Sequence, residues 1–375
     1  MSKAGAKKRI NRGAVKYFDY YMVGLVMLLL AFGLVMLFSA SSYTASMRYG
    51  SAMFFVKKQL IYTVLGFCLM LFCSKIDYHH WIRLSYPIYF VSVILCIWVI
   101  FNGSARNNSA RWIDLKIITV QPSEIAKIAC ILLNAYFISR VTFRNRKMED
   151  RLKVLAKCMV PTVIATFLVA ISNLSTALII VMLSMIMYFV AYPKSRIFIL
   201  MFLFIAFVGV LFLSLASYRS TRLKIWHHPE NFSEGYQTMQ GLYAIGSGGI
   251  FGKGLGASLQ KKFVPEAQND MIFTLICEEL GLIGAIVVIM MYILLLYRMY
   301  RIAHQAEDKA GSFIAIGVMA HVALQVLLNI AVATNSIPNT GVTLPFISYG
   351  GSSLWMMMYE LGVVLNVSRS TKFEV

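Results

Sequence analysis

The stretch Ile171-Ser172-Asn173-Leu174-Ser175-Thr176 decides how many times this chain crosses a membrane. It interrupts an apolar run from 158 to 191 that is otherwise nearly continuous. The hydrocarbon core of a bilayer takes about 20 apolar residues of helix, and the polar interruption suits a tight turn. We therefore predict two spans, 158–172 and 174–191, because one long helix would invert the orientation of everything that follows.

The composition indicates a membrane protein throughout. Hydrophobic residues make up 59% of the 375 residues and charged residues 14%, whereas soluble domains average about 45–50% apolar and about 25% charged residues. The sequence predicts an all-α integral membrane protein, with a polytopic domain (20–366) between a basic N-terminal tail (1–19) and a C-terminal tail (367–375). Ten spans are predicted, at 20–41, 59–74, 84–101, 122–139, 158–172, 174–191, 197–216, 271–297, 311–333 and 345–366.

The distribution of basic residues predicts the orientation of these spans. The formal net charge is +19, but we expect no nucleic-acid partner, because Lys and Arg collect in the cytoplasmic loops of membrane proteins. With both termini inside, the inner segments hold 22 of the 35 Lys and Arg residues and the outer segments hold 12. This excess predicts N-in and C-in, with a large extracellular loop (217–270) between spans seven and eight.

The outer basic residues are the unexpected part of this pattern, since the same rule depletes them. Most lie in two polar loops, 102–121 and 217–270. They form either a solvated loop surface or a face that holds an anionic, phosphorylated ligand, and we favour the second interpretation.

The larger loop carries glycines and then two carboxylates. Eight glycines lie between 235 and 256, and they suit either a backbone cradle for phosphate or a loop packed closely against the bundle. Glu266 and Asp270 follow, four residues apart. If the helix of 271–297 begins one turn early, both lie near its N-terminus, where the helix dipole favours anions. The simpler alternative is that Asp270 caps that helix.

Two further segments place polar groups at membrane depth. Glu124 and Lys127 lie three apart in the fourth span, as a structural pair or as ligand contacts. The segment 344–353 mixes Pro, Gly and hydroxyl residues, and broken backbone is tolerated in a membrane where it lines a cavity or is buried in protein. Three more carboxylates within spans are interpreted as facing the bundle interior: Glu278, Glu279 and Glu360.

Together these segments resemble the SEDS family, the shape, elongation, division and sporulation proteins, over nearly the whole chain. The resemblance is carried, in chain order, by Ala110-Arg111-Trp112-Ile113, Gln121-Pro122-Ser123-Glu124 with Lys127, Gly254-Leu255-Gly256, Pro265-Glu266-Ala267 through Asp270, Glu278-Glu279-Leu280-Gly281, and Leu344-Pro345-Phe346 through Ser353.

The resemblance implies a peptidoglycan glycosyltransferase of the bacterial cytoplasmic membrane. Its substrate would be lipid II, a disaccharide-pentapeptide on undecaprenyl pyrophosphate, polymerised at the extracytoplasmic face. Its partners would be a class B penicillin-binding protein, which is a transpeptidase, and other divisome proteins. The family's essential loop carboxylate falls on Asp270, and its intramembrane pair falls on Glu124 and Lys127. The segments 265–267 and 269–273 favour a septal or spore-cortex role over elongation.

The chemistry of such a reaction assigns roles to the candidate residues. An α-linked pyrophosphate donor and a β-1,4-linked product require an inverting displacement with a base on the acceptor hydroxyl, which we assign to Asp270. The leaving pyrophosphate needs cations, with a divalent cation (Mg or Mn) as a further expectation. No covalently bound cofactor is expected. The residues predicted to bind substrate or pyrophosphate are Glu124, Lys127, Arg106, Arg111, Trp112, Arg219, Arg222, Lys253, Glu266 and Ser348.

Two positions depart from the family pattern. Asn173 replaces an Asp, which removes a charge but retains hydrogen bonding. Gln268-Asn269 replaces His-Thr, so we do not expect a His-assisted mechanism. Three alternatives stay open: a lipid II flippase or other transporter, with a site near the midplane, a scaffold that recruits the transpeptidase, and an elongation-type polymerase.

Overall fold

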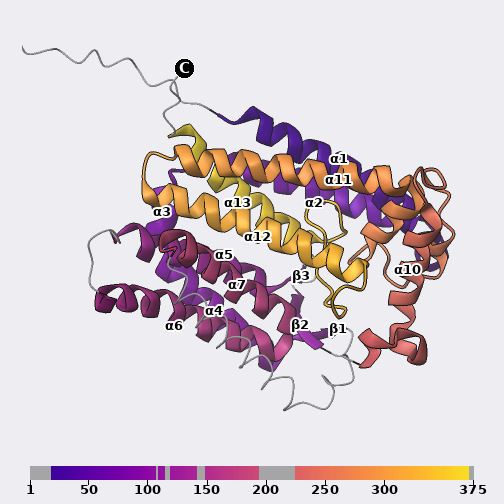
Figure 1. Ribbon diagram of the computed structural model, residues 1–375, viewed down its shortest axis with the longest axis horizontal. Helices are drawn as coiled ribbons and strands as arrows, with labels where there is room; N and C mark the ends of the chain where they lie inside the picture. The colour runs from indigo at the N-terminus through magenta and orange to yellow at the C-terminus, as the bar shows by residue number, and fades with distance from the viewer. Residues whose placement is uncertain (1–17, 107–108, 115–118, 142–147, 194–223, 371–375) are drawn as a thin grey trace, which may run out of the picture.

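The computed structural model describes residues 18–106, 109–114, 119–141, 148–193 and 224–370. Its long helices lie side by side in one bundle (Figure 1). The helices are α1 (Tyr20–Tyr49), α2 (Phe54–Cys73), α3 (Tyr78–Arg83), α4 (Ser85–Asn102), α5 (Pro122–Ser139), α6 (Met148–Ser172), α7 (Leu174–Ala191), α10 (Tyr236–Gly248), α11 (Ile272–Gln305), α12 (Lys309–Ala333) and α13 (Gly351–Arg369). Short 3-10 turns lie at η1 (Pro229–Asn231), η2 (Ser233–Gly235) and η3 (Gln260–Lys262).

Within the described residues, nine of the ten predicted spans are helices, and the seventh (197–216) lies outside them. The helices of spans four and six have the predicted bounds, whereas α1, α6 and α11 are longer than predicted. The segment 345–350 is not helical, so the last helix begins at Gly351. Seven described helices are long and apolar enough to cross a membrane: α1, α2, α4, α6, α7, α11 and α12.

The other two predicted spans, α5 and α13, are the polar helices of the bundle. On α5, Glu124, Lys127 and Asn134 are all buried, and on α13 Glu360 and Asn366 are buried. These side chains face protein rather than lipid. Because fewer of their residues contact lipid, these helices need fewer apolar residues than the other spans. Both helices pack against α12.

Local signals explain where several helices begin. Pro122 lies in the first turn of α5, where its missing N–H is not needed. Asn173 separates α6 from α7, and its Oδ1 accepts a hydrogen bond from the Thr176 backbone N–H at 3.3 Å. Asp19 caps α1 in the same way and also pairs with Arg298 of α11 at 2.6 Å. The predicted break at 171–176 is therefore confirmed as a helix cap.

The outer loops contain secondary structure that the sequence did not predict. The chain is not all-α, because the loop 102–121 contains a three-stranded antiparallel sheet of β1 (Ser104–Arg106), β2 (Ser109–Asp114) and β3 (Thr119–Val120). Strand pairing satisfies backbone N–H and C=O groups at the edge of the bundle. The loop 217–270 is also not irregular throughout, because α10 packs along α11 there.

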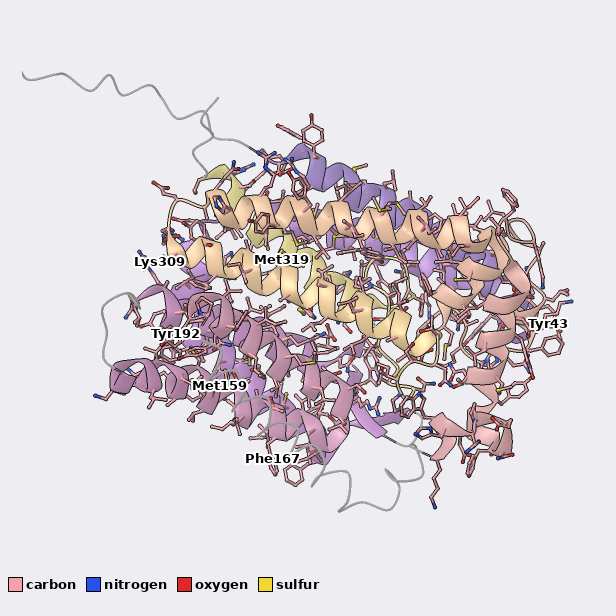
Figure 2. The ribbon with its side chains drawn as sticks, in the orientation of Figure 1. Tyr43, Met159, Phe167, Tyr192, Lys309 and Met319 are labelled. Carbon is pink, nitrogen blue, oxygen red and sulfur yellow. The ribbon has the colours of Figure 1, made fainter. Side chains whose placement is uncertain are left out.

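Figure 1 shows α4, α5, α6 and α7 on one side of the bundle and α1, α2, α11 and α13 on the other. α12 joins the two sides through its contacts with α5 and α11. α10 covers one end, and α3 lies at the opposite end. Exposed apolar side chains such as Phe167 point outward from the bundle (Figure 2), as expected of a surface that faces lipid.

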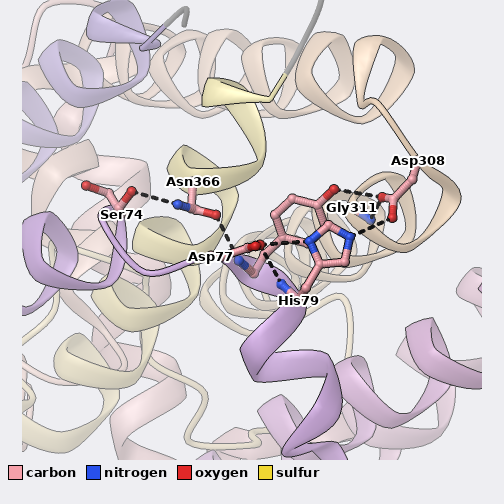
Figure 3. Close-up of polar contacts among 7 residues, drawn as sticks. Ser74, Asp77, His79, Asp308, Gly311 and Asn366 are labelled. Carbon is pink, nitrogen blue, oxygen red and sulfur yellow. Dashed lines mark hydrogen bonds and ion pairs between the residues drawn. The ribbon is translucent and has the colours of Figure 1, made fainter.

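A polar cluster ties three segments together at the α3 end (Figure 3). His79 bridges Asp77 at 2.7 Å and Asp308 at 3.1 Å, and the Tyr78 hydroxyl donates to Asp308. Asn366 of α13 accepts from the Tyr78 backbone N–H. Burial lowers the pKa of His79, but its bonds to the two carboxylates outweigh burial and raise it. His79 therefore links α3 to the loop before α12.

Candidate active site

Asp270 lies at the α10 end of the bundle, just before α11. The residue before the first turn of α11 is Met271, which has no side-chain cap. Asp270 is therefore not the helix cap, and the helix does not begin one turn early. The Asp270 carboxylate instead accepts a hydrogen bond from Gln237 Nε2 of α10 at 3.2 Å. Its backbone carbonyl accepts from Asn329 Nδ2 of α12 at 2.7 Å.

The surroundings of Asp270 raise the pKa of its carboxyl toward neutral pH. Its side chain is partly buried, and burial is the main cause that raises the pKa of Asp270 to about 6. The nearby charge of Glu266 raises it further, while the hydrogen bond from Gln237 opposes both. A base with a pKa near the working pH is ionised and still accepts a proton readily.

Glu266 does not share a helical face with Asp270 and instead places a negative charge near it. It is exposed and has a left-handed φ of 48°. Its carboxylate accepts a hydrogen bond from Asn269 Nδ2 at 2.9 Å, which closes the turn that presents Asp270.

The segment 344–350 packs directly against this turn. The Tyr349 backbone N–H donates to Gln268 O at 2.9 Å. The Ser348 hydroxyl accepts from the Leu344 backbone N–H at 2.8 Å. On α1, a Cβ at Gly33 would lie 2.7 Å from Phe346 O, so glycine there permits the close approach. Ser348 thus shapes the segment that supports the Asp270 turn.

Glu124 and Lys127 form a buried ion pair at 2.8 Å within α5. Glu124 Oε2 has no hydrogen-bond partner among the described residues. A second buried pair lies within electrostatic range of Lys127, between His321 of α12 and Glu360 of α13 at 2.8 Å. The interior of the bundle therefore holds four ionisable groups from three helices.

The outer basic residues have different environments. Arg111 Nε donates to the Ser172 carbonyl at 2.7 Å, so β2 is tied to the break between α6 and α7. Trp112 is half-buried beside it, and Arg106 ends β1 opposite Ser109. Arg219 and Arg222 lie outside the described residues.

Lys253 has a carboxylate partner within the protein. Its Nζ lies 2.8 Å from Glu278 Oε1, and Glu278 also accepts from the Leu259 backbone N–H at 3.2 Å. Lys253 is therefore paired in the same way as Lys127, which lies 2.8 Å from Glu124, and its role with pyrophosphate stays a prediction.

The glycine-rich segment is packed against α11. A Cβ at Gly248 would lie 2.0 Å from Cys277 O, and one at Gly252 would lie 2.2 Å from Glu279 O. Gly281 has a φ of 67°, which kinks α11 where this segment meets it. At these positions the alternative of a tightly packed segment is confirmed. Glu278, Glu279 and Glu360 are buried, as predicted.

A family model described as cell cycle protein, for FtsW, RodA and SpoVE, matches residues 19–373. The chain belongs to this family. The resemblance to the SEDS proteins is thereby confirmed, and the chain is a multi-pass membrane protein.

Two curated relatives of this SEDS protein share the same percentage of sequence identity with it. Stage V sporulation protein E of Bacillus subtilis (strain 168) is 38% identical over 370 residues, which cover 95% of this chain and 98% of the relative. A probable peptidoglycan glycosyltransferase FtsW of Trichlorobacter lovleyi is 38% identical over 366 residues, which cover 95% of this chain and 94% of the relative.

Two solved structures share the fold of this SEDS protein. One is a chain of a peptidoglycan synthase complex, with a TM-score of 0.80 and 25% identity, covering 96% of this chain and 99% of that chain. The other is the rod shape determining protein RodA of Thermus thermophilus, with a TM-score of 0.70 and 25% identity, covering 95% and 98%.

Three polar residues of the site were missed in the sequence: Gln237, His321 and Asn329. A signal existed for two of them, because His321, Gln325 and Asn329 recur every four residues and so share one face of α12. All three of these are buried. Gln237 had no comparable signal, because α10 itself was predicted as loop.

The described residues do not gather a ligand set for a resident metal ion: no three His, Cys, Asp or Glu side chains cluster there as ligands. The expected divalent cation stays a prediction, and the reaction below is derived from the chain's own residues alone.

Proposed function

We propose that this protein is a peptidoglycan glycosyltransferase that polymerises lipid II into β-1,4-linked glycan strands during septal wall synthesis. The observation that carries the proposal is the Asp270 carboxylate, partly buried at one end of a membrane bundle, with its pKa raised to about 6 by burial. The name of the Trichlorobacter lovleyi relative, probable peptidoglycan glycosyltransferase, supports the reaction class.

The proposed topology has ten spans with both termini in the cytoplasm. Nine described helices agree with the predicted spans, and the excess of inner Lys and Arg supports the orientation. The end that bears Asp270 and α10 then faces outward, where a lipid-linked donor presents its sugar above the membrane.

The proposed reaction is a single inverting displacement. The acceptor 4-hydroxyl oxygen attacks the donor's anomeric carbon, its O–H bond breaks, and Asp270 takes the proton. The bond from the anomeric carbon to the pyrophosphate oxygen breaks as the new glycosidic bond forms. Undecaprenyl pyrophosphate leaves with the electron pair of the broken bond.

Cations are proposed to stabilise the leaving pyrophosphate. Lys127 is the buried candidate, held by Glu124 at 2.8 Å. Arg111 is proposed to act at the outer boundary beside Trp112, and Ser348 and Glu266 to shape and charge the site around Asp270. Lys253, Arg106, Arg219 and Arg222 complete the proposed set.

A class B penicillin-binding protein is proposed as partner, together with other divisome proteins. The likeness to a chain of a peptidoglycan synthase complex supports such an assembly.

Purified protein incubated with labelled lipid II tests the function, with and without a class B transpeptidase. We expect glycan chains on a gel from the wild type and a loss of about 100-fold or more with Asp270→Asn, since a general base contributes about 10²–10⁴-fold. Full activity of Asp270→Asn would overturn the assignment of the base.

A transporter of lipid II is the second candidate, favoured by the buried group of Glu124, Lys127, His321 and Glu360. Transporters bind substrate near the bilayer midplane. Vesicles that contain the protein and labelled lipid II separate the two: a transporter moves the label across the bilayer, and it does so equally well with Asp270→Asn.

A further inference from the structure

One amide side chain joins the three segments that surround Asp270. Gln237 lies in the first turn of α10. Its Nε2 donates to Asp270 Oδ1 at 3.2 Å and to the Pro265 carbonyl at 3.3 Å. Its Oε1 accepts from Asn339 Nδ2 at 3.4 Å. Gln237 therefore connects α10, the turn before α11 and the loop between α12 and α13.

These partners determine which way the amide points. A carboxylate and a carbonyl only accept hydrogen bonds, so the amide nitrogen of Gln237 must face Asp270 and Pro265. Asn339 supplies a donor on the opposite side, where the amide oxygen lies. A flipped amide would turn its oxygen toward the carboxylate and lose these bonds. The network thus fixes one orientation of the Gln237 side chain.

The backbone of Asp270 is fixed by a different residue. Asn329 Nδ2 donates to the Asp270 carbonyl and to the Val342 carbonyl, both at 2.7 Å. On the other side of the carboxylate, Gly341 has a φ of 66°, and a Cβ there would lie 3.7 Å from Asp270 Oδ2. With glycine at this position, no side chain from residue 341 covers Oδ2.

We propose that Gln237 is a positioning residue that holds Oδ1 of Asp270 so that Oδ2 receives the proton of the acceptor hydroxyl. This inference rests on the proposed function, in which Asp270 is the base. Gln237 exchanges no proton: the acceptor O–H bond breaks, the proton goes to Oδ2, and the N–H of Gln237 stays on Oδ1. A hydrogen-bond donor held on Oδ1 fixes the carboxylate so that the lone pairs of Oδ2 face the hydroxyl of the acceptor sugar.

The same hydrogen bond has a measurable consequence. A donor on a carboxylate favours its ionised form, and the bond from Gln237 lowers the pKa of Asp270 against the larger effect of burial. Removing the donor therefore raises the pKa of the base. Because the base must be ionised to act, the acid limb of the pH–rate profile moves to higher pH.

The test measures kcat and KM of the purified full-length protein with labelled lipid II, from about pH 5 to about pH 9. With Gln237→Ala we expect the acid limb to move up by about one pH unit and kcat at about pH 5 to fall about tenfold. KM should change little, since Gln237 contacts the base rather than the substrate. Gln237→Glu should move the limb further, because a second carboxylate beside Asp270 raises its pKa.

Gln240→Ala is the matched control, because it removes the same amide one turn later on α10. We expect it to keep the wild-type acid limb. Gln237→Glu preserves the size of the side chain, so it carries the test if Gln237→Ala fails to fold in thermal unfolding assays.

Three results separate this inference from the proposed function. If Asp270→Asn is inactive while the Gln237 variants keep the wild-type acid limb, with or without a uniform loss of rate, Gln237 does not position the base and the function stands. If Asp270→Asn polymerises lipid II like the wild type, Asp270 is not the base, and the role of Gln237 falls with it while the polymerase function stands. If the wild type forms no glycan chains from lipid II, the proposed function itself is wrong.

Discussion

Asp270 is withdrawn from water by the turn that presents it, and this has a cost in stability. Burial raises the pKa of its carboxyl from 3.8 to about 6. At pH values between these two pKa values, the folded protein therefore still binds a proton that the unfolded chain has released. Stability falls as pH rises through that window, because the unfolded state ionises more easily. The carboxyl that we propose as the base therefore destabilises the folded protein at neutral pH.

Asp270→Asn should therefore inactivate the protein and stabilise it. Above about pH 6 we expect a gain of about 1 kcal/mol in the free energy of unfolding, less than the full shift implies because the side chain is only partly buried. The gain should disappear below about pH 4, where both states of the wild type are protonated. Unfolding in detergent across this pH range measures it, and a variant that is less stable than wild type at neutral pH would contradict the explanation.

At the same scale, the sequence singled out Asp270 as a candidate but did not indicate which residues contact it. A carboxylate that ends a polar loop in an apolar chain is conspicuous, whereas Gln237 and Asn329 reach it from positions 33 and 59 residues away. Lys253 is a related case. A formal charge does not reveal its partner, and Glu278 is supplied by the following helix.

Elements with a local signal were predictable, and those made by contacts were not. α5 and α7 have the predicted bounds because Pro122 and Asn173 determine where they begin. α10 and the sheet of β1, β2 and β3 have no such signal, since α10 is glycine-rich and the strands are short. Contact with α11 stabilises α10, and tertiary contacts of this kind override weak propensity.

The glycines of the segment on α11 provide a matched pair for the next prediction. Gly252 has a φ of 78°, and a Cβ there would lie 2.2 Å from Glu279 O. Gly252→Ala should lower the free energy of unfolding by about 2 kcal/mol or more, through strain and a backbone clash. Gly246 has nothing within 4 Å of such a Cβ and lies inside α10, so Gly246→Ala should stabilise by about 0.5–1 kcal/mol.

Thermal unfolding of the two glycine variants in detergent measures the difference. Equal stability would mean that the segment is not packed on α11 as described, and the alternative of an open phosphate cradle would regain support.

Across the whole molecule, α12 connects three polar assemblies. Asp308 caps its first turn and belongs to the His79 cluster at the α3 end (Figure 3). His321 pairs with Glu360 in the interior, and Asn329 holds the Asp270 backbone at the α10 end. A stiff helix with a contact at each level fixes the two ends of the bundle relative to each other, which suits a reaction that needs a stationary base.

The orientation of these two ends is testable by labelling single cysteines with a membrane-impermeant maleimide, in a Cys68→Ser background that removes the exposed thiol. Glu234 and Lys309 are exposed and belong to opposite ends of the bundle. We expect Glu234→Cys to react in intact cells and Lys309→Cys to react after lysis alone, because the excess of inner basic residues places the loop before α12 in the cytoplasm. With the N-terminus inside, the seven predicted spans before Glu234 place it outside. The reverse pattern would mean that an even number of helices crosses the membrane before Glu234, or that the termini lie outside. Since Asn173 caps α7 and divides the run from 158 to 191 into two helices, both labels also test whether each of those helices crosses the membrane separately.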